Sequence, residues 1–276
     1  MDRLRVVTLN IWNRQGPWPD RLALIRAGLV ELDPDVVGLQ EVLAFGASSQ
    51  ADEIAAGLGY HVHYAVAWTV GGGLTMGNAI LSRWPLVDAA ALPLPAPPEQ
   101  DTRSITFARV DAPCGAVPVF VTHLTYQLHL GHWRCRQVRA LADQVKALAP
   151  PSGFPAVVLG DLNAEPDADE IRFLRGLTPL GGDCVYFADG WLTTAGQEPG
   201  GGPGWTFDRR NPYALRAREP SRRIDYVLVR GPDRTLRGEP LAGRVVLDQP
   251  TAGVWPSDHF GVLVDVQAAP RRTDPY

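Results

Sequence analysis

The chain has 276 residues, of which 45% are hydrophobic and 20% charged, and this composition excludes wholesale disorder and predicts one large globular domain. Its formal net charge of -4 argues against a protein that holds nucleic acid by bulk electrostatics, because such binding depends on Lys and Arg neutralising phosphates. No run of the sequence approaches the roughly 20 apolar residues that cross a bilayer.

The first residues, MDRLRVVTLNIWN, pass directly into a strand-like run, without the apolar stretch and cleavage site of a signal peptide. We therefore expect a cytoplasmic protein, and secretion of a trimmed form stays open. Cys114, Cys135 and Cys184 are odd in number and far apart, which predicts neither a disulfide framework nor a zinc site.

Short apolar or β-branched runs predict strands, and segments with helical spacing of apolar residues predict helices between them. In chain order, the predicted strands are 4–12, 35–42, 79–82, 117–124, 156–163, 224–229 and 261–266. The predicted helices are 20–32, 50–58, 133–148 and 167–177. This mixture favours an α/β fold, with helices on the outer faces of sheets, over an all-β or all-α domain.

Two segments interrupt the pattern and predict surface loops. Segment 93–101 is proline-rich, and segment 195–220 combines glycine and proline with aromatic residues and several arginines. The second is long enough to be functional. The polar end, 269–276, predicts a flexible tail, which leaves residues 1–268 as a single domain.

Polar or charged residues lie at or just beyond the ends of six predicted strands. Any one of them could be a turn former or a helix cap, because Asn, Asp and Ser favour those positions. Together they predict one site, since the ligands of a site commonly converge from different strand ends of a rigid scaffold. They are Asn10, Gln40 and Glu41, His123, Asp161 and Asn163, Asp225, and Asp258 with His259.

Asp161 and Asn163 are two residues apart, so in an extended segment both side chains point to the same face. That spacing predicts a carboxylate beside an amide. The alternative is a turn held by an Asx hydrogen bond.

Seven motifs, in their order and spacing from about Val6 to Val266, resemble the successive motifs of the endonuclease/exonuclease/phosphatase superfamily, whose branches include deoxyribonuclease I-like and sphingomyelinase-like enzymes. They are TLNIWN, GLQEV, GNAILSRWP, VTHL, GDLNAEPD, RRIDYVLV and SDHFGVLVDV. The resemblance implies a four-layer sandwich, two mixed β-sheets flanked by helices, with the active site at one edge. It also implies Mg²⁺-dependent hydrolysis of phosphate esters, by water attack on a Mg²⁺-bound phosphate.

By this resemblance Glu41 is the principal metal ligand, and Asn10 and Asp258 complete the site. Hard Mg²⁺ prefers oxygen ligands and keeps several waters, so such a set suffices to hold it against a phosphate. The same oxygen-rich set disfavours zinc, whereas Mn²⁺ could substitute for Mg²⁺.

The resemblance also implies catalytic roles. Asp161 would orient or deprotonate the attacking water, and the Asn163 amide would donate to a phosphoryl oxygen. His259 would stabilise the charged phosphoryl group, with Asp225 fixing its tautomer. His123 matches the second family histidine of the deoxyribonuclease I and sphingomyelinase branches, where some abasic-site endonucleases carry a tyrosine.

Four residues are candidates for binding substrate. Asn78 and Arg103 match family positions near the phosphate, although an ordinary surface charge is the alternative for Arg103. Arg209 and Arg210 come from segment 205–237, which carries nine arginines and four acidic residues. Basic residues with interleaved aromatics suit stacked bases, but also a phosphorylated headgroup.

The sequence favours a hydrolase of a small-molecule or lipid-headgroup phosphoester, because an acidic chain whose only lysine is Lys146 offers one short basic segment. A DNA or RNA endonuclease or exonuclease is the alternative. A catalytically silent binding module is a remote one, since fold does not imply function, and Glu41, Asp161 and His259 are all present. Monoester or diester chemistry, one metal or two, and the oligomeric state stay open.

Overall fold

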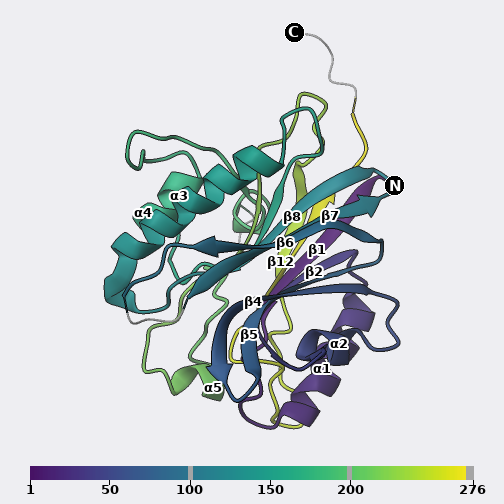
Figure 1. Ribbon diagram of the computed structural model, residues 1–276, viewed down its shortest axis with the longest axis vertical. Helices are drawn as coiled ribbons and strands as arrows, with labels where there is room; N and C mark the ends of the chain where they lie inside the picture. The colour runs from purple at the N-terminus through teal and green to yellow at the C-terminus, as the bar shows by residue number, and fades with distance from the viewer. Residues whose placement is uncertain (99–101, 198–200, 272–276) are drawn as a thin grey trace.

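Two β-sheets lie face to face at the centre of the protein, with helices on their outer faces (Figure 1). The computed structural model describes residues 1–98, 102–197 and 201–271. This arrangement confirms the predicted α/β sandwich.

The first sheet has the strand order β12-β13-β1-β2-β5-β4, and the short strand β3 pairs with β2. Its strands are β1 (Arg3–Asn10), β2 (Val36–Phe45), β3 (Ser48–Ser49), β4 (His61–Gly71), β5 (Leu74–Ser82), β12 (Pro240–Val246) and β13 (Gly261–Gln267). Because β1 and β2 run parallel, with Asn10 opposite Gln40, their carboxyl ends lie at the same edge of the sheet.

The second sheet has the order β10-β11-β9-β8-β7-β6. Its strands are β6 (Leu86–Leu94), β7 (Arg103–Ala112), β8 (Gly115–His123), β9 (Val157–Asp161), β10 (Ala188–Asp189) and β11 (Asp225–Val229). Strands β8 and β9 are its parallel pair, so their carboxyl ends also share one edge.

The helices are α1 (Trp18–Leu32), α2 (Gln50–Ala55), α3 (Gly131–Leu148), α4 (Asp169–Leu174) and α5 (Pro212–Leu215), with 3-10 turns η1 (Leu128–Leu130) and η2 (Ala195–Gln197). Helix α1 ends where Asp33 turns into the left-handed region, with φ 50°, and its N–H bonds the carbonyl of Leu29. Ser49 and Asp52 form a capping box at the start of α2.

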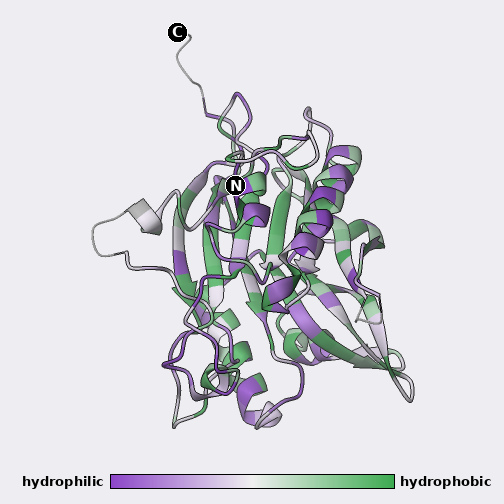
Figure 2. Ribbon diagram, turned by 90° about the vertical axis from the view of Figure 1, so that its left-hand side faces the viewer, coloured by the Kyte–Doolittle hydropathy of each residue, from purple (hydrophilic) through white to green (hydrophobic). Residues whose placement is uncertain are grey.

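Alternation along the central strands produces the layers, because successive side chains point to opposite faces of a sheet. On β1, Val6 packs between the sheets, whereas Val7 packs on the side of α1 and α2. On β9, Leu159 packs between the sheets and Val158 packs on the side of α3 and α4. The central strands are accordingly largely hydrophobic, whereas the helices mix polar and apolar residues (Figure 2).

Helix α3 is the crossover between the parallel strands β8 and β9. It leaves the edge where β8 ends at His123 and returns the chain to the opposite edge, where β9 begins at Val157. Lys146, in the last turn of α3, therefore lies at the end of the molecule remote from the carboxyl ends of these strands.

Several expected boundaries differ from those observed. Strands β4, β6, β7 and β12 were not expected as strands. The proline-rich segment 93–101 begins inside β6, and its residues 99–101 lie outside the described residues. The expected loop 195–220 contains η2 and α5. Residues 198–200 of this loop and residues 272–276 of the expected tail lie outside the described residues. Across the described ranges, no helix is long and apolar enough to span a membrane.

Candidate active site

Three adjacent strands of the second sheet place His123, Asp161 and Asp225 in one row. His123 on β8 pairs in register with Asp161 on β9, and Asp161 pairs with Asp225 on β11. All three are buried. They continue the row of Val121, Leu159 and Val227, which pack between the sheets, so their side chains face the first sheet.

From the first sheet, Asn10 reaches this row. It continues the inward-facing row of Val6 on β1, and its Nδ2 lies 3.0 Å from Asp161 Oδ2 and 3.3 Å from Glu41 Oε1. The residues on the polar ends of the two sheets therefore meet at a single edge.

Glu41 reaches the site through a β-bulge. The pairing of β2 with β5 shifts between Leu39 and Val42, and Glu41 takes a left-handed φ of 57°. Regular alternation would turn Glu41 to the face of Leu39, which packs on the helix side, so the bulge redirects the carboxylate. Its Oε2 accepts from Asn13 Nδ2 at 2.8 Å.

The segment before β13 supplies Asp258 and His259. Ser257 Oγ donates to the carbonyl of Asn10 at 2.6 Å and lies 3.2 Å from Asp258 Oδ1, which holds this segment against the end of β1. Burial raises the pKa of Asp258 to about 7, with Glu41 adding to the rise and His259 opposing it.

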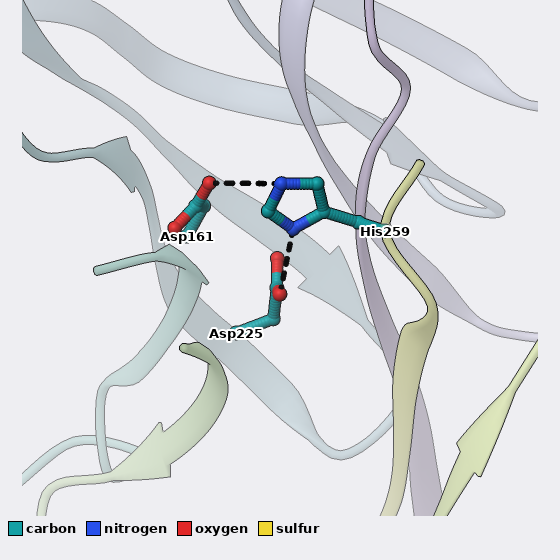
Figure 3. Close-up of side chains that lie close together, drawn as sticks. All are labelled: Asp161, Asp225 and His259. Atoms are coloured by element: carbon teal, nitrogen blue, oxygen red, sulfur yellow. Dashed lines mark hydrogen bonds and ion pairs between the residues drawn. The ribbon is translucent and has the colours of Figure 1, made fainter. Parts of the chain in front are cut away.

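The predicted contact between Asp225 and His259 is present (Figure 3): Asp225 Oδ2 lies 2.9 Å from His259 Nδ1. On the other side of the ring, Nε2 lies 3.7 Å from Asp161 Oδ2. Burial opposes a charge on the ring, but Asp225 and Asp161, with Asp258, outweigh it and hold the pKa of His259 well above its usual value. The ring also packs on Phe207, with centroids 5.0 Å apart.

Asp161 and Asn163 form the Asx hydrogen bond, in which Asp161 Oδ1 accepts the Asn163 N–H at 2.9 Å. Burial, with Asp225 adding to it, raises the pKa of Asp161 to about 6, against the opposing effect of His259 and Asn10. One N–H of the Asn163 side chain donates to the carbonyl of Leu124 at 3.1 Å, and an amide has a second N–H to offer.

His123 lies between Arg103 and Asp161. Its Nδ1 is 3.2 Å from Arg103 Nη1, and its Nε2 is 3.4 Å from Asp161 Oδ2. Arg103 is 8% exposed, which excludes the alternative of an ordinary surface charge. Asn78 is also buried and donates to the carbonyl of Ser104 at 3.2 Å, and it lines a small cavity with Glu41, Arg103 and His123.

A cavity of about 150 Å³, here called the cleft, opens beside these residues. Larger cavities, of about 350, 420 and 510 Å³, have walls that carry none of the predicted site residues, so size alone does not find the site. The cleft is lined by Glu41, His123, Asp161, Asn163 and His259, and by Tyr126, Phe207, Ala217, Glu219, Arg222 and Ile224.

The arginine that lines the cleft is Arg222, not the predicted Arg209 or Arg210. Arg209 Nη1 donates to the carbonyl of Glu219 at 3.0 Å, and Arg210 pairs with Asp208 and Asp248. The Arg222 side chain is 4% exposed and pairs with Glu219. Its Nε is buried without a hydrogen-bond partner among the described residues. Arg222 stands in the motif RRIDYVLV and in the basic segment 205–237, but nothing in the sequence distinguishes it there from the other eight arginines.

Arg21 on α1 is a second residue that the sequence did not reveal. It is completely buried, stacks 4.9 Å from the Trp12 ring, and joins the loop after β1 to the loop before β13. Burial lowers its pKa to about 10, although Asp258 opposes this. Its guanidinium donates to the backbone carbonyls of Ile11, Asn13, Gln15 and Pro256. These bonds hold the two segments that carry Asn10 and Asp258.

The chemistry of Asn10, Glu41 and Asp258 fits a hard divalent cation. Glu41 lies close enough to Asp258 to raise its pKa, and a bound cation would relieve the repulsion between the two carboxylates. Asn10 turns its Nδ2 toward Glu41 while its Oδ1 accepts the Trp12 N–H, so the amide would have to rotate to offer oxygen.

Asp161, Asp225 and His259 also offer ligand atoms within 4.8 Å of one another. Because His259 Nδ1 is already bonded to Asp225, a metal bound there through Nδ1 would replace that hydrogen bond.

Comparison with known proteins supports this description of the chain. The sequence model of the Endonuclease/Exonuclease/phosphatase family matches residues 7–259. No curated protein matches the chain. An endonuclease/exonuclease/phosphatase from Beutenbergia cavernae DSM 12333 is 27% identical, with a TM-score of 0.71 over 97% of this chain and 72% of that one.

Two further solved structures share the fold. D. rerio TDP2, complexed with single strand DNA product, is 21% identical, with a TM-score of 0.73 over 96% of this chain and 99% of that one. The human Nocturnin catalytic domain, with bound sulfate anion, is 18% identical, with a TM-score of 0.69 over 96% of this chain and 93% of that one.

Proposed function

The chain belongs to the endonuclease/exonuclease/phosphatase family, whose members are divalent-metal-dependent phosphoester hydrolases, and from this premise we propose that it hydrolyses a compact phosphate ester with Mg²⁺ as the cation. One observation carries the proposal. Glu41 of the oxygen-rich group and Asp161 and His259 of the buried group line one cleft of about 150 Å³, with Asn10 bonded to Asp161 and Asp225 bonded to His259 beside it.

We assign the metal to Asn10, Glu41 and Asp258. Once bound, Mg²⁺ or Mn²⁺ would polarise the phosphoryl oxygens and offset their negative charge. Oxygen donors are the ligands such a cation prefers, and Arg21 holds the two segments that carry Asn10 and Asp258 in place.

The remaining roles follow from the partners of each side chain. Asp161 orients or deprotonates the attacking water, which suits a carboxyl with a pKa raised to about 6. Positively charged His259, held by Asp225, stabilises charge on the phosphoryl group. The second N–H of the Asn163 amide is available to donate to a phosphoryl oxygen.

The size and lining of the cleft support a compact substrate. Phe207, Ile224 and Tyr126 offer apolar surface to the organic part of an ester, and Arg222 offers a cation at its margin. Arg209 and Arg210 lie outside the cleft lining, so we propose that they contact only a substrate that extends beyond it.

A DNA or RNA endonuclease or exonuclease is the second candidate. It is favoured by the likeness of the fold to that of D. rerio TDP2, whose structure was complexed with single strand DNA product. The net charge of -4 weighs against a nuclease that follows long duplex DNA.

A substrate panel tests the proposal. Purified protein is dialysed against EDTA and assayed with Mg²⁺, Mn²⁺ or chelator on single-stranded and duplex DNA, RNA, sphingomyelin, inositol phosphates and a bis-aryl phosphodiester. We expect turnover of a compact ester that requires the metal and is lost in Glu41→Ala, which removes a carboxylate ligand and leaves the fold intact. Full turnover in EDTA would contradict the metal requirement.

A further inference from the structure

The two histidines of the cleft have partners of opposite charge. His259 Nδ1 lies 2.9 Å from a carboxylate oxygen of Asp225. His123 Nδ1 lies 3.2 Å from Nη1 of Arg103. Both rings are buried, so these partners, and not solvent, decide where each ring holds its protons.

The partner of His123 fixes its tautomer. A guanidinium carries five N–H donors and no acceptor, and it keeps its charge at neutral pH. His123 Nδ1 must therefore accept the hydrogen bond with its lone pair, which leaves the proton of the ring on Nε2.

The contact on the other side of the His123 ring also favours a proton on Nε2. His123 Nε2 lies 3.4 Å from Asp161 Oδ2, an oxygen that can accept a hydrogen bond from an N–H. Burial, then the charges of Arg103 and His259, hold the pKa of His123 well below its usual value, so the ring stays neutral.

We propose that Arg103 is a positioning residue that holds His123 as a neutral Nε2–H donor, aimed at Asp161 in the free protein and at a phosphoryl oxygen when an ester occupies the cleft. The part of the proposal that concerns the ester rests on the proposed function; the tautomer does not.

With this tautomer, His123 and His259 have different chemical roles. Loss of a proton from a neutral imidazole would leave an imidazolate, so His123 donates a hydrogen bond and not a proton. Protonation of a leaving group then falls to His259, which holds a proton under the influence of Asp225 and Asp161, or to water.

The tautomer is measured directly on the free, full-length protein. Two-bond ¹⁵N–¹H correlation spectra of ¹⁵N-histidine-labelled protein distinguish a protonated Nε2 from a protonated Nδ1, and His123→Gln identifies the signals of His123. We expect the Nε2–H tautomer at pH 7. Arg103→Met should release it to a mixture, as should Arg103→Gln, whose amide can accept as well as donate, whereas Arg103→Lys, which has N–H donors and no acceptor, should retain it.

Kinetics provide the second readout. In Arg103→Met, kcat should fall on the order of tenfold while KM changes little, with partial recovery in Arg103→Lys. Arg109→Met is the matched control, because Arg109 lies on the same strand and pairs with the exposed Asp88. It should leave the His123 signals and the kinetics unchanged.

Each outcome decides the proposal. An Nδ1–H ring or an imidazolium at His123 in the unaltered protein would overturn it, as would an unchanged tautomer in Arg103→Met, whatever the KM. A raised KM beside an unchanged tautomer would assign Arg103 to direct substrate binding. An Nε2–H ring that depends on Arg103, in a protein without phosphoesterase activity, would support the positioning role and contradict the proposed function. If Arg103→Met fails to fold, Arg103→Lys and Arg103→Gln still test the tautomer.

Discussion

At the scale of single residues, the two buried histidines of the cleft differ in the charge of the side chain beside them. The Asp225 carboxylate places negative charge beside Nδ1 of His259, whereas the Arg103 guanidinium places positive charge beside Nδ1 of His123. Residue type alone would assign both histidines the same chemistry. Burial lowers the pKa of both rings; Asp225 and Asp161 outweigh it and raise the pKa of His259, whereas Arg103 adds to it and lowers the pKa of His123 further.

Asp225→Asn should lower kcat less than His259→Ala does. The asparagine removes the charge that holds a proton on His259 but leaves the imidazole in place, whereas the alanine removes the ring, a loss of about 10² to 10⁴ in rate. Steady-state kinetics of the two variants and of the double variant provide the comparison. Equal losses in all three would mean that the pair acts as one unit.

Arg222→Met should raise KM for the true substrate by about tenfold and change kcat less, because it removes the guanidinium that lies at the margin of the cleft over Phe207 and keeps an unbranched side chain there. Arg237→Met is the matched control, since Arg237 pairs with Asp233 away from the cleft lining. A fall in kcat at unchanged KM would instead place Arg222 in the chemical step.

At the scale of elements, Asp265 joins the first and last strands of the first sheet. It lies on β13, accepts from Arg5 Nε at 2.8 Å and Nη2 at 3.0 Å, and also pairs with Arg3 on β1. Burial would raise its pKa, but the hydrogen bond and charge of Arg5, with Arg3, outweigh burial and lower the pKa below its usual 3.8.

Asp265→Asn should destabilise the protein at pH 7 by about 1 to 3 kcal/mol, because it leaves two guanidinium groups without their carboxylate. A carboxyl with a lowered pKa contributes stability that is present above its unfolded pKa, near 3.8, and is lost as pH falls through the folded pKa. The deficit should therefore shrink below about pH 4. Urea denaturation of both proteins at pH 7, 5 and 3.5 measures it. A deficit independent of pH would exclude the charge as its cause.

The sequence predicted the strands that have long apolar runs and did not predict the strands that lack such runs. Strands β1, β2, β8, β9, β11 and β13 lie where they were expected, because they are buried on both faces and read as continuous apolar runs. Strands β4, β6 and β12 lie at sheet edges, where exposed residues interrupt the pattern. Strand β7 is internal, yet Arg103, Arg109 and Asp111 break its apolar run.

For the site, the sequence could identify these residues because the ends of the parallel strands β1, β2, β8 and β9 and the starts of the antiparallel strands β11 and β13 lie at one edge. It could not identify Arg21, which comes from a helix, and it could not distinguish Arg222 from the other arginines of segment 205–237. The sequence also did not predict the β-bulge that redirects Glu41, because no residue type in this segment marks a bulge.

At the scale of the whole molecule, net charge and cleft size together predict how activity responds to salt. For a compact ester, kcat/KM should change less than about threefold between 50 and 200 mM salt, whereas a protein that neutralises several duplex phosphates loses about 10³ to 10⁵ in affinity over that range. Initial rates across a salt series provide the measurement. Efficient digestion of plasmid DNA at physiological salt, without turnover of small phosphoesters, would contradict this and promote the nuclease alternative.

The direction of the α3 crossover has a practical consequence. Lys146, the only lysine of the chain, is exposed in the last turn of α3, at the end of the molecule opposite the cleft. An amine-reactive sensor surface that couples through this side chain would hold the molecules in one orientation, each with its cleft turned toward the flowing solution. Tethered binding assays on this protein can therefore couple it through Lys146 and leave the active face unobstructed.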